Sequence, residues 1–145
     1  MLAFDRSVTF REGQDLDVAL RNFWPPEGLW AWSSGKWAEI NFAFDFRSRP
    51  PDGLAELIID LDVFKYKDKH PGQNVLIYLN GLRVGSLYCT RRAAVVFTFN
   101  ARILSRDDNV LTLDTPDAAR PSEFGSADQR MLGVQLFSAQ IRMVD

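Results

Sequence analysis

Hydrophobic and polar residues alternate along much of the chain, most clearly over residues 37–46. Successive side chains of a β-strand point to opposite faces, so this period of two predicts a strand with one buried face. The buried face would carry Ala38, Ile40, Phe42, Phe44 and Phe46, and the opposite face Trp37, Glu39, Asn41 and Asp45. No segment keeps hydrophobic residues at the spacing of an amphipathic helix over three turns. The pattern therefore predicts a chain built from strands.

About nine short strands are predicted in all, separated by clusters of Gly, Pro, Asn and Asp. Besides 37–46, the clearest are 54–64, 74–79, 83–88, 93–99, 110–114 and 132–144, with shorter candidates at 7–10, 17–21 and 29–33. Asn80-Gly81 separates two of these strands, and both residues tolerate the positive φ of a type I′ turn, which predicts a hairpin. Residues 101–105 predict one helical turn. Residues 115–130 have turn composition throughout, and loops of that length are often functional.

Strands in this number, with no helices crossing between them, predict an all-β antiparallel β-sandwich, either jelly-roll-like or immunoglobulin-like. The chain has 145 residues, of which 46% are hydrophobic. That length predicts a single domain over 1–145, with a core that buries roughly 70% of the surface an unfolded chain exposes. No internal repeat or linker is visible.

The composition excludes several classes of function. Seventeen basic and nineteen acidic residues leave a net charge of −2, so no nucleic-acid partner is expected. One cysteine and one histidine exclude a disulfide framework, a multi-cysteine zinc site and a histidine-rich metal site. No run approaches the ~20 apolar residues of a membrane helix. With no leader peptide visible, we expect no membrane insertion and a cytoplasmic location.

All four tryptophans lie within residues 24–37. Trp rings can stack on the apolar C–H faces of sugar rings while nearby carboxylates and amides bind the hydroxyls. Trp24 stands in a Pro-rich context and is expected to be exposed. Trp30 and Trp32 share strand parity and are expected to point the same way. The alternative is that Trp30, Trp32 and Trp37 belong to the core at the ends of the sandwich.

A second candidate group is charged. Asp128 and Arg130 are two residues apart, so on a strand they share one face. Arginine can bind a carboxylate through two parallel hydrogen bonds, and Glu27 is a candidate partner. Beside Trp30, these charges would form a polar pocket with an aromatic wall. The alternative is a structural ion pair that ties the long loop to the sheet, and the residues favour neither reading.

The remaining polar residues have simpler interpretations. Asp60 and Asp62 are expected on a solvent face, about 7 Å apart, between the two carboxylate separations that glycoside hydrolysis requires. Residues 106–109 offer oxygen ligands for a structural calcium ion, although Asp and Asn equally favour a turn. No other cofactor is expected. Cys89 has no base nearby and is expected to be a small buried or edge residue, and His70 is expected to be a solvated loop residue.

The order of short motifs resembles a β-sandwich domain that recurs in bacterial polysaccharide-biosynthesis proteins and is often attached to glycosyltransferases. The matching motifs are Phe10-Arg-Glu-Gly13, Phe23-Trp-Pro-Pro-Glu27, Trp30-Ala-Trp-Ser-Ser-Gly35, Tyr78-Leu-Asn-Gly81, Leu111-Thr-Leu-Asp114 and the run from Ser126 to Gly133. That last run, Ser-x-Asp-x-Arg-x-Leu-Gly, is the most specific. The resemblance implies a jelly-roll, carbohydrate-binding-module-like domain without catalytic activity of its own. Phe23 stands where this pattern has Gly, so the local loop is expected to differ.

The leading hypothesis is a non-catalytic module that binds a saccharide through Trp24, Glu27, Trp30, Asp128 and Arg130. The alternative is a structural or assembly module that docks onto a partner enzyme or forms a homo-oligomer. An enzyme is disfavoured, because no convincing pair of nucleophile and base is present.

Overall fold

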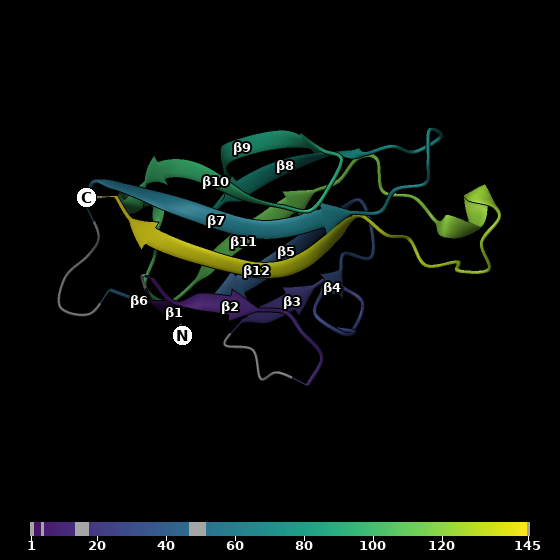
Figure 1. Cartoon of the computed structure of the whole chain (residues 1–145). Coiled ribbons are helices and arrows are strands. Elements are labelled where there is room, and N and C mark those ends of the chain that lie inside the picture. Colours follow the sequence, from purple (N-terminus) through teal and green to yellow (C-terminus); the bar gives the residue numbers. More distant parts are fainter. Residues whose placement is uncertain (1, 4, 14–17, 47–51, 145) are drawn as a thin grey trace.

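Two five-stranded antiparallel sheets lie face to face and form a β-sandwich (Figure 1). The structure is a computed structural model that describes residues 2–3, 5–13, 18–46 and 52–144. Sheet I has the strand order β10-β7-β12-β2, with β4 also paired to β12, and sheet II has the order β3-β5-β11-β8-β9. A small additional pair, β1 and β6, is parallel. The predicted all-β antiparallel sandwich is confirmed.

The element bounds follow the predicted segments closely in the second half of the chain. Sheet I contains β2 (Ser7–Thr9), β4 (Ala31–Trp32), β7 (Leu54–Val63), β10 (Ala93–Asn100) and β12 (Val134–Met143). Sheet II contains β3 (Ala19–Arg21), β5 (Trp37–Phe42), β8 (Gln73–Leu79), β9 (Leu82–Cys89) and β11 (Asn109–Asp114). The remaining elements are β1 (Leu2–Ala3), β6 (Phe44–Asp45) and the 3-10 helices η1 (Ala101–Ile103) and η2 (Pro121–Phe124). Within the described residues, no helix is long and apolar enough to cross a membrane.

The described residues form twelve strands, so the expectation of about nine is wrong. The predicted strand over 37–46 is divided at Ala43 into β5 and β6, and β6 pairs with β1 at the start of the chain. A two-residue strand is too short to show an alternation, which is why the pattern did not predict β1. The segment expected over 17–21 begins at Ala19, and Asp17 lies outside the described residues.

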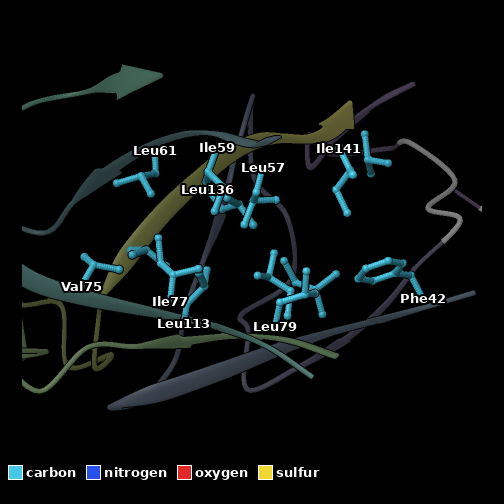
Figure 2. Packing of buried hydrophobic residues seen from close by; sticks show 14 of the residues in the cluster. Phe42, Leu57, Ile59, Leu61, Val75, Ile77, Leu79, Leu113, Leu136 and Ile141 are labelled. Carbon is cyan, nitrogen blue, oxygen red and sulfur yellow. The ribbon is translucent and has the colours of Figure 1, made fainter. Parts of the chain in front are cut away.

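The core fills the space between the two sheets. Figure 2 shows Leu57, Ile59 and Leu61 of β7 facing Val75, Ile77 and Leu79 of β8, and none of the six side chains is more than 1% exposed. Every second residue of each strand supplies these contacts, as the alternation predicted. Burial of each such side chain contributes about 1.5–3 kcal/mol of hydrophobic free energy, before the entropy of ordering it is subtracted.

The β8–β9 hairpin turns at Asn80 and Gly81, as predicted. Their φ angles are 51° and 82°, and a type I′ turn requires positive φ at both positions. The Asn80 side chain also donates from Nδ2 to the Ile103 carbonyl at 2.7 Å and accepts from the Val110 backbone N–H at 2.8 Å. The turn is thus attached to η1 and β11, which fixes the hairpin at one end of sheet II.

The strands β9 and β10 are the last strands of their sheets and pack against each other at one side of the sandwich. Gly85 of β9 lies directly against the ring of Phe97 in β10, and a Cβ atom at this position would overlap that ring. Glycine is therefore required here because it has no side chain. The close approach closes this side of the core.

The loop between β11 and β12 extends beyond one end of the sandwich and contains η2 (Figure 1). A separate hydrophobic cluster forms at this end, and we call it the end cluster. Its members are Phe64, Ala119 and Leu132, with Trp24, Trp32, Tyr66 and Phe124 packed around them. The rings of Tyr66 and Phe124 are stacked, with centroids 5.1 Å apart and planes inclined by 17°. The long loop therefore has a small core of its own.

Candidate functional site

Arg130 joins the two loops that the sequence analysis singled out. Its guanidinium donates to the Asp128 carboxylate from Nε at 3.2 Å and from Nη2 at 3.0 Å. It also donates from Nη1 to Glu27 Oε1 at 3.2 Å. All three side chains remain partly exposed. The predicted contact of Glu27 and Asp128 with Arg130 is confirmed, and its role in binding a ligand stays a prediction.

Local backbone structure brings these charges together. Glu27 and Trp30 exchange backbone hydrogen bonds of 2.9 and 3.2 Å, and Gly28 has a φ of +58° in the turn between them, a conformation that residues with a side chain seldom adopt. In the long loop, Ala119 and Leu132 form an antiparallel bridge that closes the base. The charged cluster therefore lies where the turn at Gly28 meets the long loop.

The ion pairs stabilise the charged forms of their members. Hydrogen bonds from the Arg130 side chain, and then from its backbone N–H, hold the pKa of Asp128 below its ordinary value. The hydrogen bond to Asp128 is the main cause that raises the pKa of Arg130, and Glu27 adds to it. The cluster contains one cation and two carboxylates, so it carries a net negative charge. This arrangement can hold the loops together, and its carboxylate oxygens can also accept hydrogen bonds from hydroxyl groups.

Trp24 is half-buried, so the exposure expected from its Pro-rich context is wrong. Its indole Nε1 donates to the Met131 carbonyl at 2.9 Å, and its ring belongs to the end cluster. The main described role of this ring is thus to attach the loop after β3 to the long loop before β12.

Trp30 contacts a different part of the molecule. Its ring meets Phe137 edge-on, with centroids 5.9 Å apart, and its Nε1 is buried without a hydrogen-bond partner among the described residues. Ala31, between Trp30 and Trp32, is fully buried in the main core. Trp32 packs in the end cluster, so the expectation that Trp30 and Trp32 point the same way stays a prediction. Trp30 thus packs on Phe137 and Trp24 on the end cluster, and the role of Trp30 as the aromatic wall of a ligand pocket stays a prediction.

The outer face of sheet II carries aromatic and polar side chains that the sequence analysis did not bring together. The strand register places Trp37 beside Asp114, and Asp114 beside Leu76. Trp37 in β5 is 39% exposed, and Tyr88 in the edge strand β9 is 53% exposed on the same face. One signal was available, because Trp37 falls on the polar face of the predicted strand over 37–46. The strand pattern alone does not say which sheet face remains uncovered, so Trp37 was also readable as core.

Tyr88 borders a groove of about 570 Å³ on this face, which we call the sheet II groove. Asn74 is held in place by Asp117, whose carboxylate accepts from the Asn74 backbone N–H at 2.7 Å and from Nδ2 at 3.0 Å. Arg83 donates from Nη2 to Ser86 Oγ at 2.9 Å. The groove is lined by Asn74, Val75, Leu76, Arg83, Ser86, Leu87, Tyr88 and Pro116. It therefore combines an exposed aromatic ring with oriented amide, hydroxyl and guanidinium groups.

The paired aspartates of β7 form ion pairs on the outer face of sheet I. Asp60 accepts two hydrogen bonds from Arg92, at 3.1 and 3.0 Å, and Asp62 accepts one from Lys65 at 2.6 Å. Both carboxylates are partly exposed, as expected for a solvent face. Asp62 also accepts from the Val63 backbone N–H at 2.8 Å, so both carboxylates are engaged in contacts within the molecule, as in a structural surface.

The segment over 106–109, considered as a calcium ligand set, is organised as a turn. Asn109 is buried, and its Oδ1 accepts from the Ser105 backbone N–H at 2.7 Å and from Asn80 Nδ2 at 2.9 Å. This amide oxygen is therefore already committed to the protein. Within the described residues, no three His, Cys, Asp or Glu side chains come together as a metal-binding group.

Cys89 and His70 were the residues considered for nucleophilic chemistry. Cys89 is buried, as predicted, and its thiol donates to the Arg91 carbonyl at 3.2 Å. Burial is the main cause that raises the pKa of this thiol, which opposes formation of the reactive thiolate. His70 was expected to be solvated, and this is wrong. Its ring packs against Phe64 and Phe124, with centroids 5.7 and 5.5 Å away.

Comparison with known proteins shows the fold. The chain matches no protein-family model and no curated protein. Among solved structures, it is similar to the CBM22-1 xylan-binding domain of Xyn10C from Paenibacillus barcinonensis, with a TM-score of 0.57 and 13% identity, over 100% of this chain and 98% of that one. It is also similar to part of a family GH115 4-O-methyl-α-glucuronidase, BtGH115A, with a TM-score of 0.52 and 12% identity, over 98% of this chain and 18% of that one. The chain thus has a β-sandwich fold that is also found in a carbohydrate-binding module.

Proposed function

We propose that this chain is a non-catalytic carbohydrate-binding module and that the sheet II groove holds its saccharide. The observation that carries the proposal is Tyr88, an aromatic ring that is 53% exposed beside a groove of about 570 Å³. Saccharide and other small-ligand sites combine aromatic rings with a few oriented polar groups in a concave surface, and this groove has both. The similarity in fold to a xylan-binding domain supports the same class of ligand.

The chemistry of the groove suits a sugar chain. The Tyr88 ring can stack on the C–H face of a pyranose, and the Asn74 amide, the Ser86 hydroxyl and the Arg83 guanidinium can bind its hydroxyls. Bridging water molecules complete such contacts at little cost in free energy. Trp37 lies on the same face, three strands away, or about 14 Å at the ordinary strand spacing. A second ring at that distance extends the surface along an oligosaccharide.

The biological setting is part of the proposal. The motif order that ends in the run from Ser126 to Gly133 supports an association with bacterial polysaccharide synthesis or glycosyl transfer. In that setting, the module would hold a growing or acceptor glycan near a partner enzyme that performs the chemistry. Binding would be modest in strength, because a shallow open site leaves much of the sugar in water.

The test is a glycan array followed by calorimetric titration. Xylo-oligosaccharides, arabinogalactan and bacterial surface polysaccharides serve as probes. We expect Tyr88→Ala to weaken binding of the selected glycan about fivefold to tenfold, which corresponds to a loss of ~1 kcal/mol of stacking. Leu82→Ala is the matched control, because Leu82 is an exposed residue of the same hairpin that does not line the groove. A wild-type protein that binds none of the glycans would contradict the proposal.

The cluster predicted from the sequence is the rival site, and the same titration distinguishes it. Trp30→Ala and Arg130→Gln alter the aromatic and charged parts of that cluster while the sheet II groove stays intact. If these two variants lose binding and Tyr88→Ala does not, the saccharide lies on the loops around Glu27 and Asp128. Circular dichroism spectra of each variant verify that the sandwich has formed.

A further inference from the structure

Within the described part of the chain, β10 is an edge strand that has a partner strand on one side only. It has eight residues, Ala-Ala-Val-Val-Phe-Thr-Phe-Asn, with no charged residue, no proline and no glycine. It extends for about 26 Å at the usual rise per residue. Among the described strands it pairs only with β7, so its other backbone edge faces outward. Proteins seldom leave a long uncharged edge of this kind without a partner strand.

The other sheet ends are protected in recognised ways. β2 and β3 have only three residues each. β9 contains the charged Arg83 and a register shift opposite Ile77 and Tyr78, which is a β-bulge. Short length, charge and bulges all hinder pairing with another chain. The contrast sets β10 apart from every other described sheet end.

Hydrophobic side chains near this edge are incompletely covered. On the outer face of sheet I, Val96 of β10 is 47% exposed. On the inner face, Val95 and Phe97 are only partly buried, although they pack against the core. Leu87 of β9, the neighbouring edge strand of sheet II, is also only partly buried. A partner along β10 would bury this rim and pair the free backbone groups in one step.

We propose that two copies of this chain pair along β10 in an antiparallel manner, so that sheet I runs continuously through a two-fold dimer. A second copy fits this edge because the strand is uncharged and self-complementary. With the axis at Val96, the pairs within residues 93–99 are apolar or neutral, namely Ala93 with Phe99, Ala94 with Thr98, and Val95 with Phe97, and only Asn100 lies opposite a charged residue, Arg92. A two-fold axis also brings the partly buried rim of one copy against the same rim of the other.

This dimer is a specific form of the homo-oligomer that the sequence left as an alternative function. It depends on different residues from the saccharide site. None of the β10 residues lines the sheet II groove. The two proposals therefore stand or fall separately. A monomeric variant should still bind a short oligosaccharide at its groove with the wild-type affinity, and a Tyr88→Ala variant should still dimerise.

The experiment measures molar mass by light scattering over a dilution series of the full chain. We expect the wild type to approach twice its 16.5 kDa chain mass, and Val96→Lys combined with Thr98→Lys to give the chain mass alone. Both side chains are exposed, and a charge at these positions would repel its copy across the two-fold axis. Ala127→Lys combined with Gln129→Lys is the control, because it adds the same two charges at exposed residues of the long loop between β11 and β12, and it should remain dimeric.

Three results would overturn the proposal. These are a wild type that stays monomeric up to its solubility limit, a double-lysine variant that stays dimeric, and open-ended aggregates in place of a defined mass. Hydrogen exchange of the wild type gives an independent measure that needs no variant. We expect dilution to accelerate amide exchange in β10 while β7 and β12 stay protected, and an exchange pattern unchanged by dilution would also contradict the dimer.

Discussion

Arg130 makes the largest number of charged contacts at the end of the sandwich, with hydrogen bonds to both Asp128 and Glu27. We expect Arg130→Gln to lower the free energy of unfolding by about 1 kcal/mol, a value kept small because water screens these partly exposed groups. Urea denaturation at neutral pH measures the change. Arg102→Gln is the control, because its ion pair with Asp52 is far more exposed. An equal loss in both variants would contradict a specific role for Arg130.

The same ion pair makes stability depend on acid. The pKa of Asp128 in the folded protein lies below its ordinary value of 3.8, chiefly because Arg130 donates to it. The stabilisation is therefore complete above about pH 4 and is lost as the pH falls through the lowered pKa. We expect the urea midpoint of the wild type to fall more steeply below that pH than the midpoint of Arg130→Gln. Parallel acid limbs for the two proteins would contradict this assignment.

At the residue scale, the sequence could predict contacts between residues that are close in the chain or whose side chains have few other suitable partners. Asp128 and Arg130 are two residues apart, and a guanidinium between loops has few partners other than carboxylates, so Glu27 could be named. The exposure of a tryptophan could not be predicted in this way. Trp24 is covered because the loop before β12 folds over it, and Trp37 stays 39% exposed, with the Arg21 guanidinium 5.4 Å from its ring. Both depend on contacts between distant segments.

Packing between β9 and β10 gives a prediction at the scale of elements. Gly85→Ala would place a Cβ atom inside the space of the Phe97 ring, and the two strands would have to separate. We expect a loss of about 1–3 kcal/mol, as for other overpacked sites. Thermal and urea denaturation measure it. Gly35→Ala is the matched control, because a Cβ there would meet no atom within 4 Å. A Gly85→Ala protein as stable as this control would contradict the prediction, because β9 and β10 would then have separated without loss of stability.

Elements that follow from short-range rules were predicted well. The β8–β9 hairpin depends on two adjacent residues, Asn80 and Gly81, and the long strands β7 and β12 depend on their own alternation. The short strands follow other rules. β1 exists because it pairs with β6, some forty residues away in the chain, and η2 forms within a loop whose composition indicated only turns. Pairing across such distances leaves no periodic signal in the sequence.

Cys89 offers a measurement at the scale of the whole molecule. Its side chain is buried at the end of β9 and its pKa is raised, chiefly by burial. A thiol reagent should therefore react only when the structure opens. We expect labelling in native buffer to be slow and to accelerate with urea in proportion to the global free energy of unfolding. Rapid labelling that does not depend on urea would show that the β9 edge opens locally.

The position of β9 and β10 at the same side of the sandwich has a consequence for avidity. Antiparallel strands in one sheet are related by an axis perpendicular to that sheet, so two copies joined at β10 would face the same way. Their sheet II grooves would then open side by side toward one glycan chain. Once the first groove has bound, the second meets the polymer at a raised effective concentration, and two weak sites retain a long polysaccharide far better than either site alone. Short oligosaccharides, which cannot span both grooves, would gain nothing.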